Sequence, residues 1–346
     1  MKNRKIAEKV GKELALFLEN LKIKNALLIH DEDCDGISSA SILAKLLRKK
    51  DIEIEFLAGH AGEDIKISRK FDFYFILDIP DLKLKTKNYA ILDHHLPTKV
   101  NVPYFNPRCI DKEAYIPVSC FVYEAYKEIV KKRDACWLAG IGILGDFAIK
   151  SCKYVLKEIK KEFPELISGF SRELLFEKSL LGTLTKIINS SRIVAGKRGA
   201  SMAASFLSKI NDWKEVFKFK KKESKLLLKW YFKYIEEMEK ILKVFEKEKL
   251  ENEKFVFFLA ESKYNLRSTL ASYLTKFYKG KVILIGQTIG KFIHFSARCE
   301  GCRINLVKFI EKLKKSVNAE GGGHRQAAGF RIREDKLNDL LSILKF

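Results

Sequence analysis

The chain has 346 residues, and its 66 Lys plus Arg against 44 Asp plus Glu give a formal net charge of +22. Hydrophobic residues make up 47% of the chain and aromatic residues 12%, which excludes a disordered protein because large apolar cores can form. At ~100–200 residues per domain, the length predicts two domains. No run approaches the ~18 apolar residues that cross a bilayer. Residues 1–25 predict an amphipathic helix without a signal-peptide core, so we expect a cytoplasmic protein with no membrane partner.

The charge excess concerns partners more than fold. It favours a polyanion such as nucleic acid, but the chain also has only two Gln, Gln287 and Gln326, beside abundant Lys and Glu. That bias is typical of proteins from hot organisms. Charge alone therefore leaves nucleic-acid binding and a lysine-rich background equally open.

The seven cysteines are an odd number spread over a long chain, which argues against a disulfide framework and predicts cytosolic thiols. Cys299-Glu-Gly-Cys302 is a single CxxC pair. Without a second pair nearby it is a weak zinc signal, and we interpret it as incidental.

Short apolar runs alternate with helical patterns through the first hundred residues. We expect strands at residues 26–30, 52–57, 73–77 and 89–92, and a helix at 37–47 where apolar residues recur at helical spacing. Strands that alternate with helices predict a mostly parallel sheet covered on both faces. In such sheets ligands bind beyond the carboxyl ends of the strands.

The pattern is helical from residue 119 to about 189, and residues 217–250 combine a basic run with a long helix. Further strands are expected at 255–259, 281–285 and 291–295, with helices near 266–278, 303–315 and 335–345. The predicted fold class is α/β: an N-terminal, mostly parallel sheet flanked by helices, a helical connector and a smaller C-terminal α/β domain. The expected domain ranges are 1–189, 190–250 and 251–346.

Acidic residues gather where the first predicted strand ends. Asp31-Glu-Asp33-Cys-Asp35-Gly36 has the spacing of a calcium loop, but position 42, where the closing Glu of such a loop would fall, is Ile. A calcium loop is therefore excluded. A single acid here would cap the next helix, but three acids within five residues repel one another unless a cation lies among them.

More acids and two histidines follow later strands: Asp78 ends one strand, Asp93-His94-His95 ends the next, and Asp146 follows a helical segment. Carboxylates with one or two imidazoles suit Mn²⁺ or Mg²⁺ better than zinc, whose structural sites favour thiolates. Two such ions ~3.5–4 Å apart can polarise a phosphoryl oxygen and ionise the attacking water. The set indicates phosphoester hydrolysis.

These segments resemble, in order and spacing, motifs I to IV of the DHH phosphoesterase family: Asp31-x-Asp33-x-Asp35-Gly36, Asp78, Asp93-His94-His95 and Gly145-Asp146. Two further strings resemble the S-x-R and GGGH signatures of the DHH-associated C-terminal domain: Ser296-Ala-Arg298 and Glu320-Gly-Gly-Gly-His324-Arg-Gln-Ala-Ala-Gly329-Phe330. The resemblance covers both the N-terminal and the C-terminal domain. Within the family, the chain is similar to RecJ-like nucleases, including compact archaeal proteins of the GINS-associated type.

The resemblance implies a role for each matching residue. Asp31 and Asp33 would ligate one metal ion, and Asp78 would bridge two. The second ion would be held by three residues: Asp35, His94 and Asp146. His95 would lie near the scissile phosphate, with Asp93 orienting a neighbouring imidazole. The C-terminal signatures would bind the nucleotide, through Ser296, Arg298, Gly321, Gly322, Gly323 and His324.

The implied function is a phosphodiesterase or exonuclease that uses two Mn²⁺ or Mg²⁺ ions to hydrolyse single-stranded DNA or RNA to mononucleotides. One alternative is a nanoRNase-like enzyme that degrades very short oligonucleotides or dephosphorylates phosphoadenosine phosphate. Another is a replisome subunit that docks on GINS or the replicative helicase. A scaffold without catalysis is disfavoured because the metal-ligand residues are present. Inorganic pyrophosphatases share motifs I to IV but not the GGGH signature.

Overall fold

The computed structural model describes residues 2–82 and 84–346. The chain divides into an N-terminal unit, Met1–Phe232, and a C-terminal unit, Lys233–Phe346. The division falls inside α8 (Lys222–Glu248), the long helix that the sequence places between two strand-rich regions. Among the described residues, no helix combines the length and apolar character that crossing a membrane requires.

The N-terminal unit is built on a five-stranded sheet in the order β2-β1-β3-β4-β5, and every neighbouring pair is parallel. Its strands are β1 (Asn25–Asp31), β2 (Glu53–Gly59), β3 (Phe73–Leu77), β4 (Tyr89–Leu92) and β5 (Tyr104–Phe105). The predicted parallel sheet is confirmed. The edge strand β5 has only two residues, too few for a periodic signal in the sequence.

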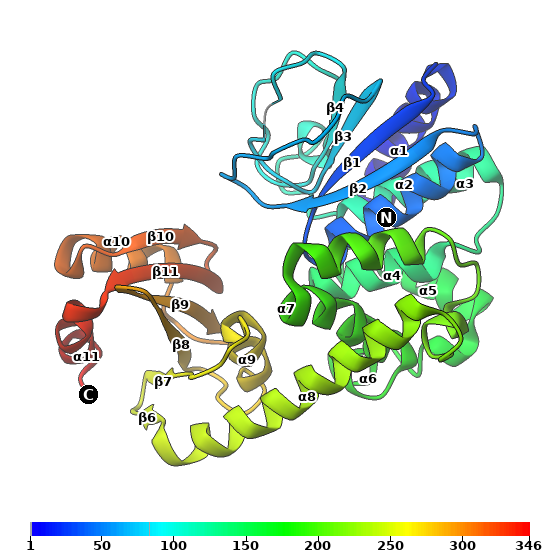
Figure 1. Cartoon of the computed structure of the whole chain (residues 1–346). Coiled ribbons are helices and arrows are strands. Elements are labelled where there is room, and N and C mark those ends of the chain that lie inside the picture. The colour runs from blue at the N-terminus through cyan, green and yellow to red at the C-terminus, as the bar shows by residue number, and fades with distance from the viewer. Residues whose placement is uncertain (1, 83) are drawn as a thin grey trace. The chain divides into compact units, whose positions relative to one another are not determined.

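The helices of this unit are α1 (Lys2–Asn20), α2 (Cys34–Arg48), α3 (Val118–Val130), α4 (Cys136–Gly145), α5 (Lys153–Glu162), α6 (Arg172–Glu177) and α7 (Leu180–Leu207). Short 3₁₀ turns are η1 (Pro107–Cys109), η2 (Pro164–Leu166) and η3 (Trp213–Val216). Figure 1 shows α1, α2 and α3 along one face of the sheet. Alternate strand residues such as Leu28 and Phe75 join the helices there in one buried core.

We expect helices on the opposite face of the sheet as well, but the described side chains that cover it come from strands and loops. Ile29 and Ile76 point into a second, smaller core whose other members include Phe71 and Ile79. Those two residues lie in irregular segments beside the strands, and none of the described members of this core belongs to a helix. Both faces are buried, as parallel strands require, but loops cover one of them.

The C-terminal unit has a six-stranded sheet in the order β10-β11-β9-β8-β7-β6, in which only β7 and β8 pair in parallel. Its strands are β6 (Leu250–Glu251), β7 (Phe255–Leu259), β8 (Val282–Ile289), β9 (Phe292–Cys299), β10 (Glu320–Gly323) and β11 (Ala327–Arg333). The helices are α9 (Arg267–Leu274), α10 (Leu306–Val317) and α11 (Leu337–Leu344), with the 3₁₀ turn η4 (Glu334–Lys336).

Successive residues of β7 point to opposite faces of this second sheet. Phe257 packs in a core with α10 and α11, whereas Phe258 faces Phe245 of α8, with ring centroids 5.4 Å apart. The smaller C-terminal α/β unit is confirmed. The sequence does not predict β10 or β11, because the glycine-rich stretch lacks the β-branched residues that mark strands.

Candidate metal centre and substrate-binding loop

Three acids lie at the carboxyl ends of three adjacent strands. Asp31 is the last residue of β1, and Asp78 and Asp93 directly follow β3 and β4. The backbone N–H of Asp78 donates to Leu92 O at 2.8 Å, which ties the ends of β3 and β4 together. The strand order reverses between β1 and β3, and such a switch point is where ligands bind in open parallel sheets.

Asp78 has a left-handed backbone, with φ of 64°. This conformation is costly for a non-glycine residue unless the surroundings impose it. Its side chain is only 3% exposed and lies beside His94. The strained backbone thus aims a buried carboxylate at an imidazole from the neighbouring strand end.

The turn between β1 and α2 is held by its own carboxylates. Asp33 caps α2 by accepting from the N–H groups of Asp35 and Gly36 at 2.8 and 3.0 Å. Asp31 Oδ1 accepts from the N–H of Asp33 at 3.0 Å. Asp31 therefore holds the backbone at Asp33, and Asp33 holds the backbone at Asp35.

The Asp35 carboxylate is fixed by a different helix. Its two oxygens accept from the N–H groups of Val118 and Ser119, at 2.6 and 3.0 Å, in the first turn of α3. Helix N-termini offer such unpaired donors and favour negative charge. Gly142 in α4 passes so close that a Cβ there would lie 2.5 Å from Asp35 Oδ1. The close approach brings α4, and hence Asp146 at its end, to the cluster.

Two buried carboxylates lie next to the His94 imidazole. Its Nε2 lies 3.2 Å from Asp78 Oδ1 and 3.3 Å from Asp146 Oδ2. Both of these carboxylate oxygens are buried and accept no hydrogen bond. Buried carboxylate oxygens without a partner are costly, and their donor set of oxygen and imidazole nitrogen fits Mn²⁺ or Mg²⁺. The residues present fit the metal that the sequence predicts.

Two groups of side chains lie close enough to share an ion: Asp35 with His94 and Asp146, and Asp78 with His94 and His95. Asp31 and Asp33 stand outside both groups, although the charge of Asp33 acts on Asp35 and Asp78. The division of ligands between two ions that the sequence suggests stays a prediction.

Burial dominates the electrostatics of the acids. Burial first and the charge of Asp33 second raise the pKa of Asp31 to about 8 and that of Asp35 to about 7. The pKa values of Asp78 and Asp146 also lie well above the usual range, through burial and then the charge of Asp35. Without a cation these carboxyls hold protons, which a divalent ion would displace.

His95 and Asp93 form a separate pair beside the cluster. Asp93 Oδ1 and His95 Nδ1 are 2.7 Å apart. Burial opposes both charges, but the hydrogen bond and mutual attraction outweigh it, so the pKa of Asp93 is lowered and that of His95 is raised. The pair thus favours the protonated form of the half-exposed His95 imidazole at the rim of the acids. From the sequence we expect Asp93 to orient a neighbouring imidazole, and the imidazole that it contacts is that of His95.

The sequence did not single out three groups that shape this site. Val118 and Ser119 bind Asp35 through backbone donors, which only the helix start after Pro117 could have signalled. Arg192 in α7 lowers the pKa of Asp31, against the larger effect of burial. Its Nε donates to Asn189 at 2.7 Å.

In the C-terminal unit, Ser296 and Arg298 lie on β9, opposite Gly329 and Ala327 of β11. The Arg298 guanidinium donates to the hydroxyls of Ser268 and Ser272 at 2.7 and 3.2 Å. It is therefore a fixed, mostly buried cation whose α9 neighbours hold its orientation.

The three glycines form β10, and two of them are required by its pairing with β11. Gly321 has φ of 158°, and a Cβ there would lie 2.5 Å from Phe330 Cα; Gly323 has φ of 148° and would meet Ala328 Cα at 2.5 Å. Gly322 is exposed and has open space around it. The next residue, His324, is also exposed and donates its backbone N–H to Ala327 O at 2.7 Å.

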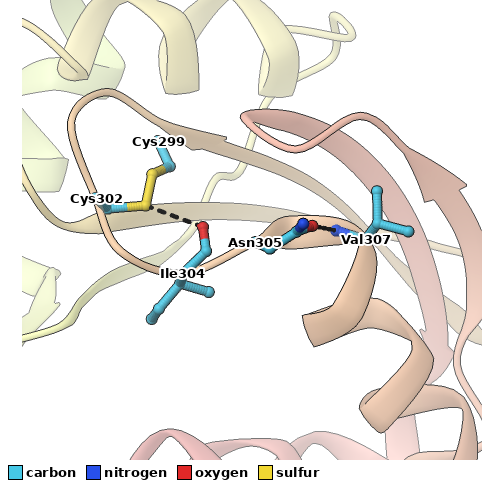
Figure 2. The surroundings of a disulfide bond; sticks show 5 residues. All are labelled: Cys299, Cys302, Ile304, Asn305 and Val307. Atoms are coloured by element: carbon cyan, nitrogen blue, oxygen red, sulfur yellow. Dashed lines mark hydrogen bonds between the residues drawn. A yellow bond between two sulfur atoms is a disulfide. The ribbon is translucent and has the colours of Figure 1, made fainter.

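Cys299 and Cys302 form a disulfide, shown in Figure 2, which corrects the expectation that all seven cysteines are thiols. The pair closes a short loop at the end of β9. The N–H of Cys299 donates to Gln326 O, and that of Leu306 donates to Arg325 O, both at 3.0 Å. The disulfide loop is therefore bonded on both sides to the segment that follows His324.

Residues 255–345 match the family model of the DHHA1 domain. This segment is therefore similar to DHHA1 domains. It contains β9, the glycine strand β10 and the disulfide loop. No curated protein is similar enough in sequence to match the chain.

Solved structures share the fold of the whole chain. RecJ from Thermus thermophilus in complex with Mn²⁺ aligns with a TM-score of 0.67 at 16% identity, over 96% of this chain and 54% of that one. The chain thus spans about half the length of that RecJ. A DHH domain described as belonging to a family of ribosomal proteins aligns with a TM-score of 0.68 at 14% identity, over 99% of this chain and 91% of that one.

A third structure with this fold is a pGpG-specific phosphodiesterase from Vibrio cholerae, with a TM-score of 0.53 and 14% identity over 93% of this chain and 97% of that one. At these identities the likeness establishes a common fold. The predicted α/β fold, a parallel sheet flanked by helices followed by a second, smaller sheet, is confirmed by these alignments.

Proposed function

We propose that this protein is a divalent-metal-dependent phosphoesterase that hydrolyses single-stranded DNA or RNA to mononucleotides. The observation that carries the proposal is the meeting of Asp78 and Asp146 at His94, with two buried carboxylate oxygens that no hydrogen bond satisfies. Perturbed, buried acids at a sheet's switch point are where catalysis is expected. The Mn²⁺-bound RecJ that shares the fold supports the choice of ion.

The ions would be held by six residues: Asp31, Asp33, Asp35, Asp78, His94 and Asp146. Bound there, two Mn²⁺ or Mg²⁺ ions would lower the pKa of an attacking water and neutralise charge on the phosphoryl group. The protein's own contribution is to keep the ligands fixed. Val118 and Ser119 hold Asp35, and the strained turn at Asp78 holds the carboxylate proposed to bridge the ions.

His95 and Asp93 are proposed to act on the substrate rather than on the metal. The half-exposed His95 cation would hold a phosphate oxygen, and Asp93 would keep its imidazole protonated and oriented. The C-terminal unit would hold the neighbouring nucleotide through the charge of Arg298, whose guanidinium Ser268 and Ser272 keep in a fixed orientation. Its partners in that task are proposed to be Ser296, Gly321, Gly322, Gly323 and His324.

A matched pair of variants tests the metal assignment. Asp78 and Asp81 lie three residues apart, both with left-handed backbones, at φ of 64° and 60°. Asparagine tolerates that conformation, so Asp78→Asn and Asp81→Asn each replace a carboxyl group by an amide of similar size without new strain. We expect Asp78→Asn to lose Mn²⁺-dependent nucleotide release by at least a thousandfold, while the exposed Asp81→Asn keeps it. Equal activity in both variants would refute the assignment.

A second candidate is a phosphodiesterase of very short oligonucleotides, of the nanoRNase or phosphoadenosine-phosphate phosphatase type. The observation that favours it is the shared fold with a pGpG-specific phosphodiesterase, whose substrate is a dinucleotide. Digestion of labelled 2-, 5- and 30-nucleotide strands of DNA and RNA separates the two candidates. Rates that rise with length support the exonuclease, and rates that collapse beyond a few nucleotides support the alternative.

Docking on GINS or the replicative helicase stays a prediction from the sequence resemblance. It is tested by co-precipitation with purified GINS or helicase, using a preparation whose nuclease activity is intact. Failure to bind under those conditions counts against it.

A further inference from the structure

A groove lined by basic residues lies in the N-terminal unit, outside the acidic cluster. It is an open groove of about 650 Å³ formed by the first turn of α1, the segment just after α4, and α5. Grooves of this volume are large enough for a ligand of one or more nucleotides. Lys150, which lines it, follows the proposed metal ligand Asp146 by four residues, so the groove begins where the metal-binding segment ends.

Positive charge dominates the groove lining. Seven of its eleven residues are Lys or Arg, and Glu158 is the one acid among them. Glu158 accepts from the Tyr123 hydroxyl at 3.0 Å and from Lys127 Nζ at 3.2 Å, so its charge is already compensated inside the unit. The groove therefore presents a net positive surface.

Three of the cations already pair with acids: Lys2 with Asp111, Arg4 with Glu8 and Arg133 with Glu162. The other four are different. Among the described residues, no carboxylate lies in ion-pair distance of Lys150, Lys153, Lys157 or Lys161, and all four are exposed. These ammonium groups are the part of the groove that an anion can neutralise.

Lys153, Lys157 and Lys161 form a ladder on one face of α5. Their spacing of four residues places successive side chains about 6 Å apart along the helix, a spacing of the same order as that of phosphates in an extended strand. Like charges at this spacing destabilise a helix. A linear chain of phosphates would remove that repulsion at all three positions, whereas a compact anion would reach one or two.

We infer that this groove binds the sugar-phosphate backbone of single-stranded nucleic acid. The inference rests on the proposed function, since it supplies a path for the strand beyond the metal centre. A single strand fits better than a flat anionic surface, because the charges line a concavity rather than a plane.

The test uses the full chain, a fluorescent 20-nucleotide single strand and EDTA to prevent hydrolysis. The groove variant is Lys153→Gln/Lys157→Gln/Lys161→Gln. The matched control is Lys12→Gln/Lys22→Gln/Lys70→Gln, which removes the same charge from exposed lysines of the same unit outside the groove. Affinity is measured by anisotropy across a range of salt concentrations, and dinucleotide hydrolysis with Mn²⁺ is measured in parallel on the wild type.

We expect the groove variant to bind the strand at least tenfold more weakly than the control. Its salt dependence should also fall by about 2 in slope, at ~0.7 per lost phosphate contact. Equal affinities for the two triple variants would overturn the inference. A wild type that binds the strand through the groove but hydrolyses nothing would refute the proposed function and leave the groove standing.

Discussion

Nε2 of His94 and Oδ1 of Asp78 lie 3.2 Å apart at the ends of two adjacent strands, and Asp78 Oδ1 accepts no hydrogen bond. The two groups are brought together by the sheet rather than by local sequence, since β3 and β4 pair in parallel with Leu77 opposite Leu92. A site built on rigid strand ends keeps its ligands in place before an ion binds.

Metal binding should change how stability depends on pH. In the metal-free protein the pKa values of Asp35 and Asp31 are raised to about 7 and about 8, from an unfolded value near 3.8. Because a raised pKa stabilises the protonated form, this contribution is complete below pH ~4 and is lost as the pH rises through 7 to 8. We therefore expect the Tm of the metal-free protein to fall across this window.

Manganese should reverse that loss, because the ion replaces the protons. At a Mn²⁺ concentration 100 times its Kd at pH 8, the ion should add about 2.7 kcal/mol to the free energy of unfolding at that pH. At the same Mn²⁺ concentration the gain in Tm should be smaller at pH 6, because protons compete with the ion for the carboxylates. Thermal unfolding with and without Mn²⁺ at both pH values measures this. An equal Mn²⁺ effect at the two pH values would contradict the account of the buried acids.

Gly142→Ala should weaken Mn²⁺ binding, because its Cβ would meet Asp35 Oδ1 at 2.5 Å. We expect a loss of about 10–100-fold in affinity, as for other changes that displace a ligand's support. Gly140→Ala is the control in the same helix. Its Cβ would press on Ile159 Cδ1, at 2.5 Å, and cost ~1–3 kcal/mol of stability with unchanged affinity for Mn²⁺. Calorimetric titration and Tm separate the two effects.

Asp93→Asn should lower kcat by about 10–100-fold with metal affinity preserved, since Asp93 supports His95 and does not join the acids at His94. Tyr104→Phe serves as the comparison, because its hydroxyl reaches Asp93 Oδ2 only at 3.4 Å. We expect that variant to keep most of its activity. A drop in Mn²⁺ affinity in Asp93→Asn would assign Asp93 to the metal instead.

Gly322→Ala distinguishes substrate contact from strand geometry in the C-terminal unit. A methyl group there meets no protein atom within 4 Å, so folding should be unaffected, but a phosphate close to the backbone would be blocked. We expect KM to rise at least tenfold with Tm unchanged. Gly321→Ala and Gly323→Ala should instead lower Tm by disturbing β10. A normal KM in Gly322→Ala would remove Gly322 from the binding site.

Thiol titration of the unfolded protein tests the Cys299–Cys302 disulfide. Five cysteines are free: Cys34, Cys109, Cys120, Cys136 and Cys152. Protein unfolded without reductant should therefore show five reactive thiols, and seven after reduction. Seven thiols before reduction would mean that the bond does not form.

The acids at the strand ends could be predicted from the sequence because each interrupts an apolar run with a charge, as at Asp78 and Asp93. Their neighbours could not. The donors for Asp35 come from Val118 and Ser119, more than eighty residues away, and no local pattern records that contact. Tertiary packing decides it.

The GGGH segment is a second case in which tertiary contacts, and not the local sequence, decide the structure. A run of glycines has little strand propensity, yet it pairs as β10 because β11 offers alternating buried residues such as Ala328 and Phe330. The disulfide was missed because the odd number of cysteines favoured thiols, whereas the turn after β9 brings Cys299 and Cys302 together. The geometry of this loop, rather than the number of cysteines in the chain, decides that the bond forms.

The most direct test of the central claim is a crystal structure of the protein with Mn²⁺, with the ions located by their anomalous scattering. We predict two manganese peaks ~3.5–4 Å apart at the ends of β1, β3 and β4, with Asp78 in contact with both. One of the two ions should contact Asp35, His94 and Asp146. Manganese peaks only at other places, or none at saturating Mn²⁺, would contradict it.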